Sequence, residues 1–192
     1  RSLRYVILRE NWRVSKFIRR IVIDYNDYID IDYKDYIESV PNFPKDGILY
    51  RDIQPLLENR NAFNQAINEM YSLTAIKPDY YVGIESRGFI FASALANKFG
   101  KGFKMIRKSG KLPDGNHTLV STEYDLEYGT DTIEMKPGSG SVIIVDDIFA
   151  TGGTMEAAEN LCKFGGYEIL DKLCLMDIGI KKDHDVKCLI KY

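Results

Sequence analysis

Two adjacent aspartates, Asp146 and Asp147, directly follow an apolar segment that reads VIIV from Val142. Such a segment is typical of a buried strand, where a carboxylate is costly unless it is paired or hydrogen-bonded. Two carboxylates can accept the two hydroxyls of a vicinal diol, and each charge-assisted bond of this kind is worth roughly 1.5–3 kcal/mol. The pair could instead ligate a divalent cation, because Mg²⁺ prefers carboxylates together with substrate phosphate.

A Thr-Gly-Gly-Thr turn, Thr151 to Thr154, follows these aspartates and opens a predicted helix. Free backbone N–H groups and the helix dipole favour an anion at such a position, and glycines let the backbone come close to it. The turn is not a Walker A loop, because it lacks the Gly-Lys-Ser/Thr sequence. Diol acceptors just before a phosphate cradle indicate a ribose 5-phosphate. The alternative is an ordinary helix start beside incidental acids.

Two further polar loops end predicted strands. Glu85 to Gly88 follows the apolar segment Tyr80 to Ile84, and Arg107 to Lys111 follows the segment Phe103 to Ile106. In parallel sheets, ligands bind beyond the carboxyl ends of the strands. The sequence therefore predicts one site, built where these two loops meet the loop from Asp146 to Thr154.

The elements that position these loops alternate between strands and helices. Three- and four-residue apolar spacing predicts a helix from Arg60 that stops before Pro78, and another over Phe89 to Phe99 that Gly100 ends. Strand–helix–strand alternation favours an α/β fold with a mostly parallel sheet flanked by helices. The predicted strands are Tyr80 to Ile84, Phe103 to Ile106, Ser141 to Val145 and Leu170 to Met176.

The remaining elements are predicted with less regular patterns. We expect a helix over residues 33–39, then a loop that reads PNFPKDGILYRDI. The polar segment Leu112 to Gly140 holds two possible short hairpin strands. Thr154 is expected to cap the last helix, which Gly165 and Gly166 close.

Bulk composition excludes several classes of protein. The chain has 192 residues and a net charge of −2, so its overall charge attracts neither nucleic acid nor an anionic membrane. It has no apolar run long enough for a membrane-spanning helix. Three scattered cysteines match neither a disulfide framework nor a metal knuckle, and two histidines disfavour a histidine-rich metal site. We expect a reducing, intracellular compartment.

Charge is unevenly placed at the start of the chain. Basic residues dominate positions 1–23, and acidic residues dominate positions 24–38. An arginine-rich, acid-poor start can be an organellar transit segment, an extra helix that packs on its own domain or on a partner, or an added tag. These alternatives stay open.

The segment VIIVDDIFATGGT resembles the phosphoribosyl-pyrophosphate (PRPP) motif of the type I phosphoribosyltransferases. Four other segments resemble the adenine phosphoribosyltransferases of that family, in the same order and at similar separations. They are FPKDGILYRDI from Phe43, GIESRGF from Gly83, RKSGKLP from Arg107 and YDLEYGTDTIE from Tyr124. The resemblance covers roughly Tyr33 to Met176. It leaves out the basic N-terminus, and the tail after Asp177 is shorter than is usual in the family.

The resemblance implies a type I phosphoribosyltransferase fold over residues 33–192, after an N-terminal extension at 1–32. A small hood at about 33–55 and a mobile lid at about 112–137 are expected. The implied reaction converts adenine and PRPP to AMP and pyrophosphate in the cytoplasm, with Mg²⁺ bound mainly through PRPP. A homodimer is implied, with no nucleic acid or membrane partner. The alternative is a regulator that binds PRPP or nucleotide on this fold without turnover.

The resemblance also implies roles for individual residues. Asp146 and Asp147 would bind the ribose hydroxyls, and Ala150, Thr151, Gly152, Gly153 and Thr154 the 5-phosphate. Arg87, Lys108 and Lys111 would bind pyrophosphate, with Arg87 and Lys111 counted as catalytic. Glu127 would handle a proton at the purine or stabilise the cationic sugar, and Tyr128 would help close the site. Leu49, Tyr50 and Arg51 would bind adenine, and no residue is assigned as a metal ligand.

Three local details accompany the resemblance. A non-proline cis peptide is expected between Glu85 and Ser86. Tyr50 stands where the family more often has Phe; the ring can still stack on a base, but its hydroxyl needs a partner. Phe149 stands where Leu is usual, which we interpret as apolar packing.

Overall fold

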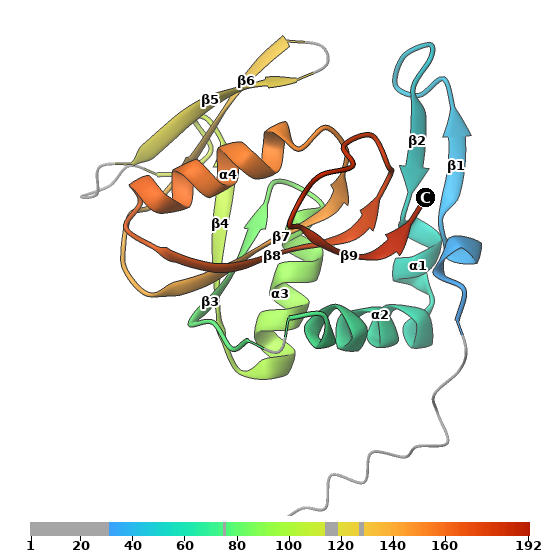
Figure 1. The fold of residues 1–192 in the computed structure, drawn as a ribbon, viewed down its shortest axis with the longest axis horizontal. Helices are drawn as coiled ribbons and strands as arrows, with labels where there is room; N and C mark the ends of the chain where they lie inside the picture. The colour runs from blue at the N-terminus through green and yellow to red at the C-terminus, as the bar shows by residue number, and fades with distance from the viewer. Residues whose placement is uncertain (1–30, 75, 114–118, 127–128) are drawn as a thin grey trace, which may run out of the picture. The chain divides into compact units, whose positions relative to one another are not determined.

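A seven-stranded sheet forms the centre of the fold in the computed structural model (Figure 1). The structure describes residues 31–192 except 75, 114–118 and 127–128, so residues 1–30 of the predicted N-terminal extension lie outside the described part. Within that part, no helix is long and apolar enough to cross a membrane. The strands are β3 (Tyr80–Ile84), β4 (Gly102–Lys108), β5 (Val120–Leu126), β6 (Gly129–Met135), β7 (Ser141–Phe149), β8 (Glu168–Asp177) and β9 (Lys187–Lys191).

The sheet is mostly parallel, as the alternation of strands and helices predicts. Its order is β5-β6-β4-β3-β7-β8-β9. Within this order, the five strands β4, β3, β7, β8 and β9 run parallel to one another. β5 and β6 form an antiparallel hairpin that pairs with β4 through β6. The two short strands expected between Leu112 and Gly140 therefore extend the central sheet.

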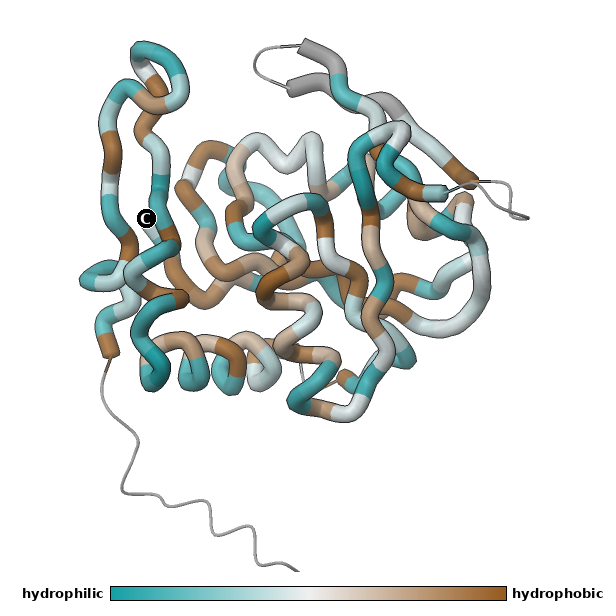
Figure 2. Tube along the Cα trace, turned by 180° about the vertical axis from the view of Figure 1, so that it is seen from behind, coloured by the Kyte–Doolittle hydropathy of each residue, from teal (hydrophilic) through white to brown (hydrophobic). Residues whose placement is uncertain are grey.

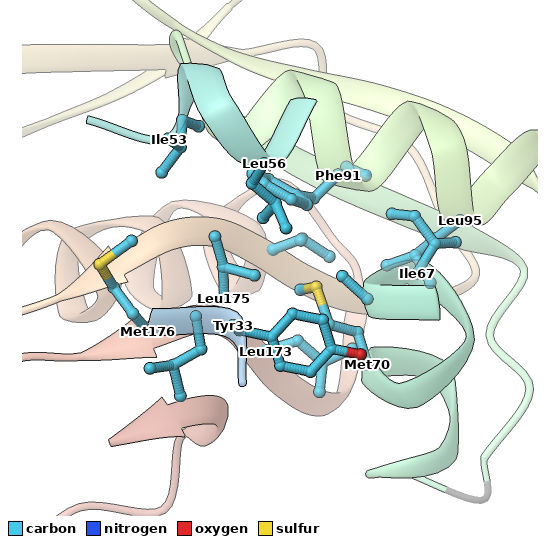
Figure 3. Close-up of a cluster of buried hydrophobic side chains, with 14 of the residues drawn as sticks. Tyr33, Ile53, Leu56, Ile67, Met70, Phe91, Leu95, Leu173, Leu175 and Met176 are labelled. Carbon is cyan, nitrogen blue, oxygen red and sulfur yellow. The ribbon is translucent and has the colours of Figure 1, made fainter. Parts of the chain in front are cut away.

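Helices cover both faces of the sheet. Side chains of α2 (Arg60–Ser72) and α3 (Gly88–Phe99) pack with Tyr81, Ile143 and Leu175 on one face. Side chains of α4 (Gly153–Phe164) pack with the next residues along the strands, such as Val82 and Ile144, which point to the other face. Figure 3 shows the first cluster, in which residues of α2 and α3 meet residues of β8. Along α2, hydrophilic and hydrophobic residues alternate (Figure 2), as expected for a helix with one buried side.

The segment before α2 differs from the prediction. The helix expected over residues 33–39 is only a short 3₁₀ helix, Tyr33–Tyr36, and residue 38 already belongs to a strand. The segment expected to be a loop forms an antiparallel hairpin of β1 (Glu38–Pro41) and β2 (Leu49–Asp52), followed by the short helix α1 (Gln54–Glu58). The prolines that indicated a loop lie at the end of β1 and in the turn, positions where a hairpin tolerates proline.

Several predicted boundaries are confirmed, and two are wrong. The strand expected to end at Val145 continues to Phe149, so Asp146 and Asp147 lie within β7 and not after it. β3 spans the expected residues, and Gly100 ends α3 in the left-handed conformation with φ of 64°. Thr154, however, does not cap α4. The helix begins at Gly153, and its cap is Gly152, which makes no side-chain hydrogen bond and has φ of 91°.

Candidate active site

The three suspected loops meet at one edge of the sheet, beyond the carboxyl ends of β3, β4 and β7. Strand register explains this, because Ile84 pairs with Ile106 and Gly83 pairs with Val145. Glu85 and Arg107, which follow Ile84 and Ile106, and Asp146, which follows Val145 within β7, therefore reach the same edge of the sheet. The peptide between Glu85 and Ser86 is cis, as expected.

Asp146 and Asp147 are buried in the last part of β7, at 9% and 4% exposure. Burial, reinforced by the charge of Asp147, raises the pKa of Asp146 well above its ordinary value. Burial also raises the pKa of Asp147, although the nearby Arg87 opposes this shift. Asp146 Oδ1 accepts the Asp147 backbone N–H at 2.9 Å. Asp147 Oδ2 is buried and accepts no hydrogen bond of good geometry from the described residues, although the Arg87 guanidinium lies beside it.

Gly88, the first residue of α3, lets the helix start approach these aspartates closely. A Cβ atom at this position would lie 2.7 Å from the Val145 carbonyl oxygen and 3.0 Å from Asp146 Oδ1. Any larger residue would push α3 away from β7. Arg87, which precedes Gly88, is thereby held next to the carboxylates.

Arg87 joins the aspartates to the β1–β2 hairpin. Its Nη2 atom lies 2.8 Å from Asp147 Oδ2, in an ion pair without hydrogen-bond alignment. Its Nη1 atom donates to the Tyr50 hydroxyl and to the Arg51 carbonyl, both at 3.0 Å. The guanidinium carbon is 5.0 Å from the centre of the Tyr50 ring. Residues predicted to bind ribose, pyrophosphate and adenine are therefore neighbours, and the Tyr50 hydroxyl has the partner that it needs.

Glu85 organises the loop that follows β4. It accepts the Lys108 backbone N–H at 2.8 Å and pairs with Arg107 at 3.3 Å and with the Lys111 ammonium at 3.0 Å. Burial opposes the charge on Glu85, but these three partners outweigh it and lower the pKa of Glu85 to about 2. The buried Glu134 accepts the Lys111 backbone N–H at 3.2 Å and so fixes the same loop from β6.

The two lysines predicted to bind pyrophosphate are paired with acids in this structure. The Lys111 ammonium contacts Glu85, and the Lys108 ammonium lies 2.8 Å from Asp131 Oδ2 on β6. Both lysine side chains are about half exposed, at 49% and 51%. The more exposed Lys108–Asp131 pair is worth little, so an incoming polyanion can replace Asp131 at small cost. Glu85, at 9% exposure, keeps its bonds to the Lys108 backbone N–H and Arg107 if Lys111 turns to the polyanion.

The predicted phosphate loop connects β7 to the start of α4. Thr151 is exposed, whereas Gly152 is buried beneath other side chains. A Cβ atom on Gly152 would lie 3.2 Å from the Phe149 ring and 3.2 Å from Lys181 Cδ. Only glycine combines this backbone conformation with so little space. The first amides of α4 have no acceptor within the helix and therefore suit an anion.

Sequence reasoning missed the segment after β8, which lies against the phosphate loop. Lys181, His184, Phe149 and Gly152 help to line a cavity of about 400 Å³. The His184 ring lies 4.2 Å from the Phe149 ring, and its Nε2 atom is 3.2 Å from Asp177 Oδ2. Two lysines in a short polar segment were the available signal, but the resemblance ended at Met176 and gave them no role.

Two predicted residues, Glu127 and Tyr128, lie outside the described part of the chain. Within the described part, no group of three His, Cys, Asp or Glu residues is arranged to hold a metal ion. The Asp146–Asp147 pair lies shortly before the phosphate loop in the chain. It fits a cation whose other ligands come from a bound polyphosphate.

Comparison with known proteins identifies the family. The Phosphoribosyl transferase domain matches residues 52–192. An adenine phosphoribosyltransferase of Hydrogenovibrio crunogenus is 54% identical over 147 residues, which cover 74% of this chain and 83% of the relative. The relative of that name from Bdellovibrio bacteriovorus is 44% identical over 162 residues, covering 81% of this chain and 96% of the relative.

Solved structures agree in fold. The adenine phosphoribosyltransferase of Thermoanaerobacter pseudethanolicus superposes with a TM-score of 0.76 at 37% identity, over 83% of this chain and 97% of that one. The Giardia lamblia enzyme, solved with 9-deazaadenine, gives a TM-score of 0.75 at 31% identity, over 84% of this chain and 96% of that one. This chain therefore belongs to the phosphoribosyl transferase family and, within it, to the adenine phosphoribosyltransferases.

Proposed function

We propose that this protein transfers the 5-phosphoribosyl group from PRPP to adenine, giving AMP and pyrophosphate in purine salvage. The observation that carries the proposal is the buried Asp146–Asp147 pair, which lies directly before the phosphate loop at the start of α4. The names of the relatives supply the base, adenine.

Asp146 and Asp147 accept the two ribose hydroxyls of PRPP. The Asp147 oxygen that lacks a hydrogen bond in this structure gains one, so burial of its charge becomes less costly. The amides and hydroxyls of Ala150 to Thr154 hold the 5-phosphate. Together these contacts fix the anomeric carbon between the base and the leaving group.

Pyrophosphate leaves toward Arg87, Lys108 and Lys111. The bond from the anomeric carbon to the pyrophosphate oxygen breaks, and its electron pair stays on that oxygen. These three cations oppose the growing negative charge, an effect that is largest when water is excluded. Glu85 and Asp131 hold the lysines before the substrate arrives, so each ammonium changes one anionic partner for another.

Adenine binds at β2 and attacks the anomeric carbon through N9. Backbone groups of Leu49 and Arg51 read the purine edge, and the Tyr50 ring stacks on its face, a contact worth roughly 1–3 kcal/mol. Glu127 accepts the N9 proton, or it stabilises the cationic sugar while that proton passes to an oxygen of the leaving pyrophosphate. The β5–β6 hairpin, inside the expected lid region, closes over the substrates together with Tyr128 and keeps water from hydrolysing PRPP.

Mg²⁺ is proposed to bind mainly through PRPP oxygens, with Asp146 and Asp147 as the protein carboxylates within reach. When bound, it neutralises part of the charge on pyrophosphate. A homodimer is also proposed, supported by the exposed apolar residues Phe103 and Met105 on β4, at 36% and 40% exposure. A cytoplasmic location stays a prediction from the sequence.

The direct test uses labelled adenine, PRPP and Mg²⁺ with the purified protein. We expect labelled AMP to form and guanine and hypoxanthine to compete poorly with adenine. Bound nucleotide without AMP formation at micromolar protein would favour the non-catalytic regulator instead. Strong competition by guanine or hypoxanthine would contradict the assignment of adenine.

A further inference from the structure

One guanidinium contacts both substrate subsites of the proposed enzyme. Arg87 uses Nη1 for the Tyr50 hydroxyl and the Arg51 carbonyl, and it uses Nη2 for Asp147. Tyr50 and Arg51 belong to β2, which binds adenine in the proposed function, whereas Asp147 belongs to the PRPP side. The two partners on β2 lie 36 and 37 positions before Arg87 in the chain, so tertiary structure alone brings them together.

The Tyr50 ring also makes contacts that do not involve its hydroxyl. The Phe43 ring meets it edge-on, with centroids 5.1 Å apart, and Arg87 lies 5.0 Å from its centre. β2 also pairs with β1, where Val40 faces Tyr50. Loss of the hydroxyl therefore keeps these ring contacts and removes one specific restraint, the bond to Arg87.

We propose that the Tyr50 hydroxyl is a positioning group that couples the adenine and PRPP subsites through Arg87. The inference rests on the proposed function, because it assigns a link between the two substrates of that reaction. The hydroxyl does not touch the reacting atoms. It fixes the position of a cation that faces the leaving group.

The direction of the coupling follows from the donors of Arg87. A guanidinium has five N–H donors, and the bonds to β2 occupy only those of Nη1. Nε stays available to pyrophosphate oxygens, while Nη1 keeps its contacts with β2 and Nη2 its contact with Asp147. Bound PRPP therefore restrains Arg87, which in turn restrains the Tyr50 ring and the Arg51 carbonyl in the arrangement that adenine needs. The two ligands should strengthen each other's binding, as any such coupling must be reciprocal.

The test compares the wild-type protein with Tyr50→Phe, which keeps the ring and removes the hydroxyl. Titration calorimetry measures the Kd of 9-deazaadenine, in which carbon replaces the attacking N9, with and without saturating PRPP and Mg²⁺. The ratio of the two Kd values reports the coupling. The control is Tyr167→Phe, because the Tyr167 hydroxyl donates to the Lys136 carbonyl at 3.1 Å and contacts neither subsite.

We expect PRPP to tighten 9-deazaadenine binding in the wild type and in Tyr167→Phe. In Tyr50→Phe this ratio should fall by about threefold to tenfold, the range for loss of one hydrogen bond to a partly exposed cation. The reverse ratio, for PRPP with and without 9-deazaadenine, should fall equally. A merely structural role would weaken both ligands and leave the ratio unchanged.

Two results would overturn the inference while the proposed function survives. In the first, the wild type forms AMP but PRPP does not change its Kd for 9-deazaadenine. In the second, the ratio of Kd values is the same in the wild type and in Tyr50→Phe. A fall of the ratio in Tyr167→Phe as large as in Tyr50→Phe would also overturn it. Failure of the wild type to make AMP would instead refute the proposed function, and the inference with it.

Discussion

Replacing Asp146 by asparagine should stabilise the fold and impair the use of PRPP at the same time. Burial and the charge of Asp147 raise the pKa of Asp146 well above 3.8. A carboxyl whose pKa is raised in the folded state favours folding when protonated, and this contribution is lost as pH rises through the folded pKa. Asparagine carries no charge at any pH, so the variant does not lose this contribution as pH rises. It can also accept the Asp147 N–H that Asp146 Oδ1 accepts at 2.9 Å.

The stability gain should therefore depend on pH. Between pH 3.8 and the folded pKa of Asp146, the free energy of unfolding of the variant should rise relative to that of the wild type by about 1.4 kcal/mol per pH unit. Above the folded pKa this difference should stay constant. Below pH 3.8 the gain should vanish, because both states of the wild type are protonated there. For a domain of this size each kcal/mol raises Tm by about 2–4 °C.

Activity should change in the opposite direction. An amide oxygen accepts a hydrogen bond about half as strong as that of a carboxylate, so kcat/KM for PRPP should fall by roughly tenfold. Thermal unfolding followed by circular dichroism between pH 3 and 8, together with AMP formation from labelled adenine, measures both effects. Asp35→Asn, at an exposed position, is the control that should change neither. Lower Tm at pH 7 or unchanged PRPP kinetics in Asp146→Asn would refute the reasoning.

Three other substitutions test separate parts of the site. Glu85→Gln removes the anion that holds the Lys111 loop, so kcat/KM should fall by about fivefold, within the range for a partly buried pair. Since the pKa of Glu85 is lowered to about 2, its stabilisation should be present above pH 4.5 and lost as pH falls toward 2; parallel acid-unfolding curves for wild type and variant would contradict this. Gly152→Ala places a Cβ 3.2 Å from the Phe149 ring at φ of 91°, so KM for PRPP should rise at least about tenfold, and an unchanged KM would remove the loop from the phosphate site. Glu127→Gln should lower turnover more than AMP affinity, and equal losses in both measurements would argue against a catalytic role.

Local patterns predicted much of the central fold. β3 was predicted in full because its segment is mostly apolar. The end of α3 was predicted because glycine readily adopts the left-handed conformation, which Gly100 has with φ of 64°. The β1–β2 hairpin was missed since its pairing joins residues on either side of a proline-containing turn, which local reasoning takes for a loop. β9 (Lys187–Lys191) was missed because it is short and pairs with β8 across the polar segment 178–186, a pairing that local patterns do not show.

Motifs predicted that three loops meet at one edge of the sheet, as they do in the structure, but they could not reveal the contacts between these loops. The sequence does not show that Arg87 pairs with Asp147, or that Glu85 holds Lys111, because strand register decides those partners. It does show that the Tyr50 hydroxyl needs a partner. Only the structure identifies this partner as Arg87.

A crystal structure of the protein with AMP would test the central claim most directly. We expect the 5-phosphate within the loop Ala150 to Thr154, and both ribose hydroxyls about 2.5–2.8 Å from the carboxylates of Asp146 and Asp147. AMP bound elsewhere, with these carboxylates facing no ribose hydroxyl, would contradict the assignment of the site and of the mechanism built on it.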